Sequence, residues 1–554
     1  MDTQKVIGLL KNNWKSGLTV AIINIPLSIS LAVASGATPI QGIITGIWAG
    51  IIASIFASSH YNIFGVAGAL TSILLTFVLA NGENGVALLP LLAICSGLIM
   101  YVIYLLKITK YITLIPSTVL HGFLISVGIT IALGQISGAL GLNNPVLNVP
   151  QHKEIYMNLF EVFNHITSTD IASFLLFAFG LVFLLIFKKY KPTFPAVIVL
   201  TIVGILFGMF TKESLPTILQ LSDKYTDLTF TLFQNPFNFK IANIKEFVSL
   251  ANILFTTSLV IAIIAILETI ISAKIAEKIT KVKFNKDREV LGLALSNMGS
   301  GIMGGLPATA VFIRTALNIK SGATHKTSAF LVAIITLVIS ALLFNGYFKY
   351  LPFPIISAIL MNIALGLIDI NLLKKLYSIE KIAFYTTILT TALAILIEPI
   401  YGILAGISVT LLIFLRRVTK SDVNVSIFRK GEFTIKDKLT NYLLDQKVGD
   451  ILLMKFSGGL NYLNIENIFS SIEQLNQKQT IIISFSHMGD LDIDGLEMLN
   501  EMIEHLHNNE VTIYLSGIEG ENKDLISKIE IYPEMEKNGM IKDSTSAILQ
   551  ELLN

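Results

Sequence analysis

Long apolar runs, separated by short polar segments, fill the chain from about Gly17 to Val418. A helix needs about 20 apolar residues to cross the hydrocarbon core of a bilayer. On that length, the pattern predicts about fourteen membrane-spanning helices, at residues 17–35, 40–57, 64–80, 87–106, 114–135, 170–187, 195–211, 250–273, 289–305, 307–320, 326–346, 353–368, 382–398 and 401–418. The chain is therefore predicted to be an α-helical membrane protein.

Two of these spans look too broken to cross the membrane alone. The segments IFGVAGALTSILLTFVLA (63–80) and GGLPATAVFIRTALNIK (304–320) open with Gly or Gly-Pro. About 14 helical residues after Pro307 reach only about 21 Å. If the spans form two repeats of seven, both short spans are third in their half, as expected for inverted-repeat transporters with a midplane site. The alternative is that Gly and Pro are simply frequent in membrane helices.

A different pattern follows Lys420. The segments VGDILLMKF (448–456), TIIISFS (480–486) and VTIYLS (511–516) predict short buried strands, whereas 465–477 and 495–509 have helical periodicity. Strands that alternate with helices are typical of a small α/β domain.

Composition supports this division of the chain. With 53% hydrophobic and 14% charged residues, the chain is too apolar for a soluble protein. A net charge of +2, with no basic face, gives no reason to expect nucleic-acid binding. We expect a membrane domain over residues 1–420 and a cytoplasmic domain over residues 421–554.

The basic residues between the spans predict the orientation. If Lys5, Lys11 and Lys15 are cytoplasmic, alternate loops should be basic. Every such loop except 58–61 is basic, and these loops hold Lys107/Lys110, Lys188/Lys189/Lys191, Lys274 to Arg288, Lys320/Lys326, Lys374/Lys375/Lys381 and Arg416/Arg417/Lys420. An even number of spans then leaves both termini in the cytoplasm, and the protein in the inner (plasma) membrane. The N-terminal segment lacks a small-residue cleavage site, so the first span is expected to stay.

No motif typical of an enzyme occurs in the sequence. It has no nucleophile elbow, no GxxxxGK[ST] phosphate loop, no HExxH and no CxxC. His60, His121 and the histidines of the soluble region lack metal-ligand spacing, and the single Cys95 cannot form an intramolecular disulfide. We therefore expect no catalysis, no bound metal and no cofactor apart from a coupling ion.

Arg314 lies inside the second broken span, where a cation costs roughly 2.5 kcal/mol or more and usually faces a cavity or a partner. We expect a half-helix that begins near Ala308–Thr309–Ala310, with Arg314 about two turns into it. A helix N-terminus exposes unpaired N–H groups and a positive dipole end, so an arginine behind it favours anion binding. The start of the other half-helix, Ala67–Gly68–Ala69, offers the same groups. The alternative is that Arg314 snorkels to the cytoplasm.

Glu268 is the corresponding acid, in the apolar stretch VIAIIAILETIISAKIAEK. It should resist ionisation, because desolvation disfavours the charged form, and a carboxyl that can change state is what proton coupling requires. Ser272 lies four residues later on the same helical face. The alternative is a structural Glu paired with Lys274 or Arg314. Pro26 frees a backbone carbonyl within the first span, which either lines the same cavity or only kinks the helix.

Four stretches of the chain resemble the SulP anion transporters, a family whose animal members include prestin and pendrin. They are GLTVAIINIPLSISLAVASGATPIQGI, FGVAGALTSI, ILETIISAKIAEKIT and GGLPATAVFIRTALNIKSGATHKTS. The resemblance covers nearly the whole chain and is most specific in PATAVFIRTALNIKSGAT. It implies two inverted repeats of seven spans, arranged as a moving core and a gate as in uracil permeases. It also implies a homodimer and a C-terminal STAS domain.

The resemblance also implies site residues in the first, third, eighth and tenth spans. For the substrate they are Pro26, Leu27, Ala67, Gly68, Ser272, Thr309, Ala310 and Arg314, and for the coupling ion Glu268. Many members have a polar residue, often Gln, where this chain has Leu27, which weakens a sulfate-specific interpretation. In bicarbonate-transporting members an acid at position 268 and a hydroxyl at 272 help to hold sodium. In dicarboxylate-transporting members, a Glu at this position accompanies proton coupling. Glu is the longer of the two acidic side chains, and its presence at position 268 favours protons as the coupling ion.

The STAS-like region departs from its relatives in the loop SHMGDLDIDGLEML, which contains Asp492, Asp494 and Gly495. Relatives often have an Asp-x-Ser/Thr-Gly turn here, whose hydroxyl is phosphorylatable in bacterial anti-sigma antagonists. Asp494 replaces that hydroxyl, so we expect no phosphorylation switch at this position. Its carboxylate is expected to cap a helix that begins near Gly495.

The predicted function is secondary active transport of a small anion, sulfate or a related inorganic anion, by proton symport and elevator-type alternating access. Sodium-coupled bicarbonate transport and C4-dicarboxylate transport are alternatives. A nucleobase permease would have the same membrane fold, but it would usually lack a STAS domain, and Arg314 does not suit a neutral base. A membrane-anchored scaffold or signalling protein, whose STAS domain binds a cytoplasmic partner, is the alternative from another class.

Overall fold

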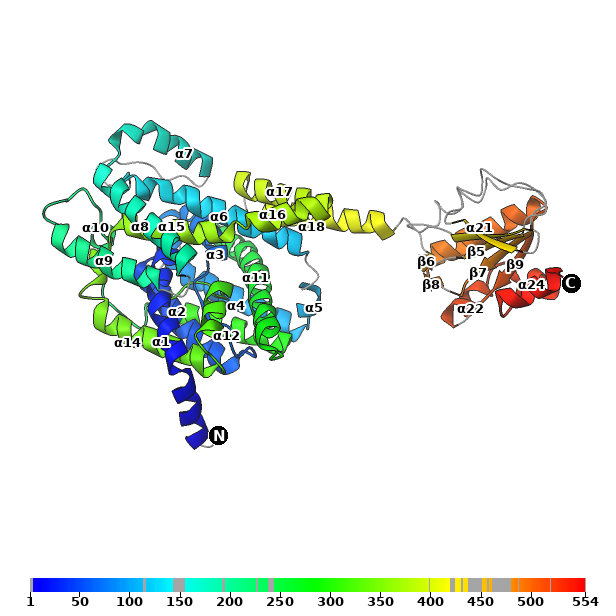
Figure 1. The fold of residues 1–554 in the computed structure, drawn as a ribbon, viewed down its shortest axis with the longest axis horizontal. Coiled ribbons are helices and arrows are strands. Elements are labelled where there is room, and N and C mark those ends of the chain that lie inside the picture. Colours follow the sequence, from blue (N-terminus) through cyan, green and yellow to red (C-terminus); the bar gives the residue numbers. More distant parts are fainter. Residues whose placement is uncertain are drawn as a thin grey trace. The chain divides into compact units, whose positions relative to one another are not determined.

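The computed structural model describes residues 3–553 apart from 113–115, 143–154, 192–194, 226–227, 238–243, 398, 419–423, 430–431, 437–450, 456–457, 461–479, 487 and 519. The chain forms two compact units, Met1–Ser408 and Val409–Asn554. Both are drawn in Figure 1, and each is described by itself.

The first unit is a bundle of helices, through which the long α1 runs (Figure 1). Its helices are α1 (Thr3–Ala34), α2 (Pro39–Phe56), α3 (Gly68–Ala80), α4 (Gly85–Leu105), α5 (Thr109–Ile112), α6 (Ser117–Ala139), α7 (Ile155–Asn164), α8 (Ile171–Tyr190), α9 (Ala196–Thr211), α10 (Leu221–Lys224), α11 (Ile244–Thr280), α12 (Lys286–Ile302), α13 (Phe312–Lys320), α14 (Thr327–Leu343), α15 (Phe353–Leu367), α16 (Ile370–Ile379) and α17 (Lys381–Leu396), with 3-10 turns η1 (Gly82–Asn84), η3 (Ile166–Ser168) and η4 (Phe348–Tyr350). Helix α18 (Pro399–Val418) begins in this unit and ends in the second. Each predicted span contains one helix. Among the described residues, 7 helical stretches are long and apolar enough to cross a membrane.

The helices form two groups that combine corresponding parts of the two halves of the sequence. Helices α1 to α4 pack with α11 to α14, and helices α6, α8 and α9 pack with α15 and α17. The groups meet mainly where α1 and α3 lie against α6, α9 and α15. The predicted helical membrane fold, with a core and a gate, is confirmed.

Glycines allow the closest helix contacts. A Cβ added at Gly97 of α4 would lie 2.8 Å from the carbonyl oxygen of Ala294 in α12. A Cβ added at Gly122 of α6 would lie 2.6 Å from the carbonyl oxygen of Thr387 in α17. Because lipid is as apolar as these side chains, close backbone packing at small residues is a main source of helix association in a membrane.

Two short strands interrupt the bundle. Strand β1 (Phe64–Gly65) pairs antiparallel with β2 (Thr309–Ala310), so that Phe64 lies opposite Ala310 and Gly65 opposite Thr309. Helix α3 follows β1 after two residues, and α13 follows β2 after Val311. Helices α3 and α13 have only 13 and 9 residues. Both broken spans are therefore half-helices, each preceded by extended backbone.

The predicted start of the second half-helix is wrong. Thr309 and Ala310 belong to β2, and α13 begins at Phe312. Arg314 is therefore in the first turn of α13, not two turns into it. The physical reason is that neighbouring helices and β1 pair the backbone of the preceding residues, which a single-chain helical pattern does not reveal.

The second unit contains a mixed sheet with strand order β10-β9-β7-β5-β3-β4, where β10, β9, β7 and β5 are parallel and β3 is antiparallel to both neighbours. The strands are β3 (Asn424–Arg429), β4 (Glu432–Lys436), β5 (Ile451–Lys455), β7 (Thr480–Ser484), β9 (Thr512–Ser516) and β10 (Ile541–Lys542), with a separate pair β6 (Gly458–Leu460) and β8 (Met488–Leu491). The helices are α21 (Ile493–Asn508), α22 (Glu521–Ile526), α23 (Tyr532–Lys537) and α24 (Thr545–Leu553). The three predicted strands and the α/β class are confirmed. The predicted helix 465–477 lies outside the described residues.

Successive side chains along each strand point to opposite faces of the sheet, so this unit has hydrophobic core residues on both faces. Leu452 and Met454 pack with α21, whereas Leu453 packs with Ile482 and with Ile548 of α24. Helices therefore cover both faces.

Candidate functional site

The extended segment before α13 is held by side chains from other helices. The amide of Asn297 in α12 binds Ala308 twice: Oδ1 accepts from its N–H at 2.8 Å, and Nδ2 donates to its carbonyl at 3.0 Å. Leu306 is bound in the same way, since its N–H donates to Thr45 Oγ1 at 2.7 Å and its carbonyl accepts from Ser300 Oγ at 2.9 Å. These side chains replace the helical hydrogen bonds that the segment lacks.

Two glycines make this arrangement fit. Gly304 has φ of +89°, which favours glycine. A Cβ added at Gly305 would lie 2.5 Å from Ser300 Oγ and 2.8 Å from Thr45 Oγ1. The Gly-Gly pair thus lets the chain turn sharply and then pass close to the hydroxyls that bind Leu306.

Helix α11 binds β2 from another side. Thr309 Oγ1 donates to Glu268 Oε2 at 2.9 Å, and Thr269 Oγ1 accepts from the N–H of Ala310 at 3.1 Å. Thr309 and Ala310 are fully buried, and Glu268 is partly buried. The structure therefore brings Glu268 directly to the strand pair.

Ser272 lies one turn further along α11, in a separate polar network. Its Oγ lies 3.0 Å from Asn62 Oδ1 and 3.0 Å from Thr315 Oγ1. Thr315 Oγ1 also accepts from the N–H of Ile63, just before β1. Among the described residues, the hydrogen bonds of Ser272 thus join α11 to α13 and to the segment before β1, and they do not include Glu268.

Glu289 anchors the same segment and was not identified from the sequence. It lies fully buried in the first turn of α12. Oε2 accepts from the N–H groups of Ser58 and Ser59 at 2.8 and 2.6 Å, and Oε1 accepts from Asn62 Nδ2 at 2.7 Å. One carboxylate therefore fixes the turn that leads into β1. Its position beside Lys286 and Arg288 made it look like an ordinary charge at a helix end.

Arg314 is a buried charged group beside the strand pair that lacks hydrogen-bond partners. Its side chain is 2% exposed, and among the described residues Nε, Nη1 and Nη2 have no hydrogen-bond partner. A Cβ added at Gly65 would lie 2.6 Å from Nη1, so the guanidinium packs directly against β1. Glu268 is the carboxylate with which it interacts electrostatically. A buried cation with no hydrogen bonds costs several kcal/mol, on the order of 3 to 5, which an anion would offset.

The backbone around this guanidinium also suits an anion. The N-caps of α3 and α13, Ala67 and Val311, make no side-chain capping hydrogen bond. Because β1 and β2 are antiparallel and each leads into its half-helix, both N-termini start at the strand pair. Uncapped helix N-termini attract anions through their N–H groups and dipoles.

The remaining predicted residues belong to α1 and to the start of α3. Ala67 and Gly68 are buried at the start of α3, and Pro26 is buried inside α1. Leu27 is half-buried and packs against the hydrophobic core. Their part in a binding site stays a prediction.

The loop of the second unit corrects one prediction. Helix α21 begins at Ile493 with Asp492 as its N-cap, and Asp492 Oδ1 accepts from the N–H of Gly495 at 2.8 Å. Asp494 is exposed in the first turn. The capping residue is thus Asp492, because the helix starts two residues earlier than predicted.

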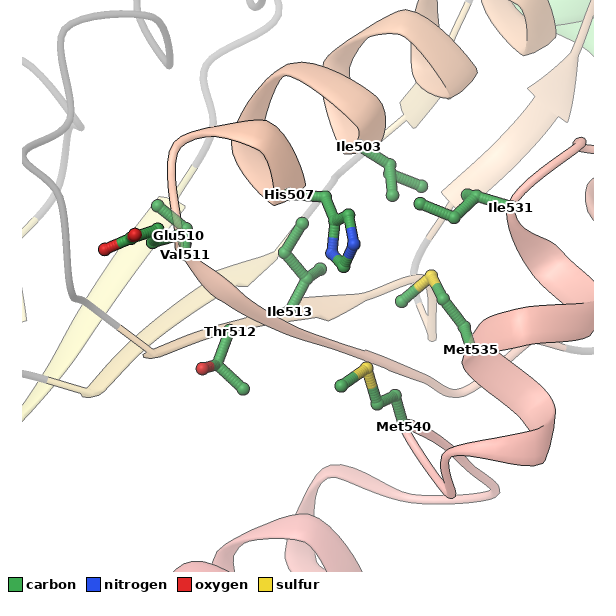
Figure 2. Close-up of a pocket in the computed structure, with 9 residues that line it drawn as sticks. All are labelled: Ile503, His507, Glu510, Val511, Thr512, Ile513, Ile531, Met535 and Met540. Carbon is green, nitrogen blue, oxygen red and sulfur yellow. The ribbon is translucent and has the colours of Figure 1, made fainter.

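The second unit also has a cavity of about 200 Å³ beside α21, β9 and α23 (Figure 2). The cavity is lined by Ile503, His507, Glu510, Val511, Thr512, Ile513, Ile531, Met535 and Met540. Figure 2 shows the His507 ring between Ile503, Ile531 and Met535, while Glu510 points away. Most of its wall is the hydrophobic core of this unit, so it offers little polar recognition.

Two family models match the chain. Residues 10–390 match the Sulfate permease family, and residues 442–546 match the STAS domain. The first match contains the strand pair, both half-helices, Glu268 and Arg314.

Individual proteins are similar over nearly the whole chain. The "Putative sulfate transporter YvdB" of Bacillus subtilis is 26% identical, over 94% of this chain and 94% of its own. The "Bicarbonate transporter BicA" of Picosynechococcus sp. is 22% identical, over 97% of this chain and 94% of its own. The structure of the murine Solute Carrier 26 family member A9 anion transporter in the inward-facing state has the same fold, with a TM-score of 0.80 at 13% identity, over 100% and 96% of the two chains.

The contact between Gly65 and Arg314 gives a first prediction. Gly65→Ala should push the guanidinium away from β1, because the added Cβ would overlap Nη1. Sulfate or another anion that raises the melting temperature of the wild type should then raise it less, because the ligand binds the variant more weakly. Gly366→Ala is the control, since its Cβ would meet nothing nearer than 3.8 Å. An unchanged anion effect in Gly65→Ala would contradict this geometry.

The Glu289 network gives a second prediction. Glu289→Gln keeps the shape but replaces one accepting oxygen with an NH2 group, so at least one of the buried donors of Ser58, Ser59 and Asn62 loses its partner. We expect the free energy of unfolding to fall by about 1–3 kcal/mol, measured as a lower melting temperature of the purified protein. Glu277→Gln, near the C-terminal end of α11, is the control. Equal melting temperatures for the two variants would show that the network does not hold the turn.

Proposed function

Because the chain belongs to the sulfate permease family, we propose that it is a secondary active transporter of a small anion. The observation that carries the proposal is the buried, unpartnered guanidinium of Arg314 beside two uncapped half-helix N-termini. The family and STAS assignments made from the sequence are confirmed. Its relatives are named as transporters, which supports the prediction that the chain is not an enzyme.

The substrate is a small oxyanion, either sulfate or a related inorganic anion. One relative is named for sulfate and another for bicarbonate. Backbone N–H groups and one arginine suit both ions, and also a C4-dicarboxylate. The anion would lie between the starts of α3 and α13, near Ala67, Gly68, Thr309 and Ala310, with Pro26 and Leu27 on the side of α1 and Ser272 supporting α13.

Glu268 couples transport to protons in this proposal. Its Oε2 accepts from Thr309 at the strand pair, and its charge opposes that of Arg314. A proton on the carboxyl removes this negative charge and strengthens the field that an anion meets. Sodium coupling is the alternative, but the Ser272 hydroxyl is engaged by Asn62 and Thr315.

Movement would follow an elevator-type alternating-access scheme. The group of α1–α4 and α11–α14 carries the strand pair and is the moving core, while the group containing α6, α8, α9, α15 and α17 is the gate. We assign residues 1–420 to the membrane domain and 421–554 to the STAS domain. The protein would be a homodimer in the plasma membrane with both termini in the cytoplasm. Its STAS domain would be free to bind a cytoplasmic partner through the Asp492–Gly495 loop.

Proton coupling predicts concentrative uptake. Liposomes with the purified protein should accumulate labelled anion when given an inward proton gradient. Glu268→Gln should abolish this accumulation but keep anion exchange, because glutamine retains a hydrogen-bond acceptor for Thr309 but carries no charge to neutralise. Equal uptake driven by a sodium gradient alone would exclude the proton assignment. No uptake of sulfate, bicarbonate or fumarate under any gradient would favour the scaffold alternative.

Arg314 predicts a graded loss of affinity. Arg314→Ala should weaken anion binding about tenfold or more, because a charge-assisted contact in a buried site contributes about 1.5–3 kcal/mol. Arg314→Lys should keep part of the affinity if the field of the cation matters more than its geometry. Thermal shift against anion concentration measures both. If the alanine variant binds anions with wild-type affinity, Arg314 does not contribute to the binding site.

A further inference from the structure

A second cavity of about 160 Å³ lies between the core and the gate, away from Arg314. Its walls come from α1 and α3 of the core, from α6 and α15 of the gate group, and from α7 and α10, which pack beside that group. The lining includes the C-terminal end of α1, at Val33 and Ala34, and the outer turns of α3, at Leu75 and Leu79. It is therefore on the side of the membrane opposite the N-terminus, which is the outer side in the proposed orientation.

Several polar side chains line this cavity, and two of them suit an anion. Ser72 of α3 is 8% exposed, and its Oγ has no partner among the described residues. Lys224 also lines the cavity, with Nζ 5.7 Å from the ring centroid of Phe353 and 6.0 Å from that of Tyr225. The described residues place no carboxylate within 4.0 Å of Nζ. The acid in the lining, Glu161, lies 3.7 Å from His165 Nδ1.

We propose that this cavity is an outer anion subsite, in which Lys224 attracts an oxyanion and the Ser72 hydroxyl binds it on its way to or from the central site. The inference rests on the proposed function. Ser72 lies one turn beyond the N-terminus of α3, on the same half-helix that starts at the central site. The volume is well above the roughly 10–15 Å³ that one water needs, so a small anion with part of its hydration fits.

The cavity is also positioned to change during transport. Tyr225 Oη, next to Lys224, donates to the carbonyl of Ala37 at 3.2 Å. Gln220, at the start of the same short segment, donates from Nε2 to the carbonyl of Gly208 in α9. The segment is thus anchored to the gate group and touches the turn after α1 in the core. Movement of the core past the gate would break the Tyr225 contact and open the subsite to the outer solution.

The test is anion uptake by cells that express the full chain, where the outer face is defined. The probe is labelled sulfate, or labelled bicarbonate if only bicarbonate shows saturable uptake by the wild type. Lys224→Gln should raise the KM for external anion about two- to fivefold, as expected for one exposed charge. The KM of this variant should also rise less steeply with ionic strength. Salt screens the attraction between Lys224 and the anion, and the variant no longer has that attraction. Ser72→Ala should raise KM without changing the salt dependence.

Matched controls separate this role from a structural one. Lys212→Gln removes an outer lysine that lies over the Tyr350 ring and does not line the cavity, so it should leave KM unchanged. Lys224→Arg should restore the low KM and its salt dependence. The affinity measured by thermal shift for the Arg314 site should be unchanged in Lys224→Gln.

A Lys224→Gln variant with the KM and salt dependence of Lys212→Gln would overturn the subsite. The same holds if Lys224→Arg fails to rescue. Absence of any anion uptake by the wild type is a different result, since it would contradict the proposed function itself.

Discussion

Extended backbone inside a membrane must have its N–H and carbonyl groups paired, and this constraint governs the structure around the strand pair. An unpaired group there costs several kcal/mol, since no water is available to it. Asn297 pairs both polar groups of Ala308, while Thr45 and Ser300 do the same for Leu306. Helix α12 carries Asn297 and Ser300, so its side chains hold the extended backbone of the broken span.

The same constraint accounts for the hydrogen bonds that hold the segments around the site. Thr269 and Thr309 hold β2 against α11, and Glu289 holds the turn before β1. Each of these groups already has a backbone or side-chain hydrogen-bond partner. Among the described residues, the guanidinium nitrogens of Arg314 have no hydrogen-bond partner, and they lie where the half-helices begin. A polar group that the protein itself does not satisfy is the strongest structural indication of a ligand.

The sequence was sufficient for the features that depend on local periodicity. Apolar length predicted a helix in every span, and the cost of a membrane cation drew attention to Arg314. The start of α13 was not predictable, since β2 pairs with β1 about 245 residues earlier. Glu289 was missed for the same reason, because its partners Ser58 and Ser59 lie on a distant turn. Asp492 rather than Asp494 caps α21 because a cap depends on where the helix starts, which periodicity locates only within a few residues.

In the proposed mechanism, charge balance in the site would decide which states of the core can move. With Glu268 ionised and no anion, its charge balances that of Arg314. With Glu268 protonated and a monovalent anion bound, Arg314 and the anion balance instead. A proton alone leaves a net charge of about +1 and a monovalent anion alone leaves about −1, and a net charge is costly in a low-dielectric environment. Only the empty and the doubly loaded core are then neutral, which is the condition for strict symport. The same reasoning separates the candidate substrates: bicarbonate would move with one proton as a neutral set, whereas sulfate with one proton would carry a net charge of about −1 and respond to membrane potential.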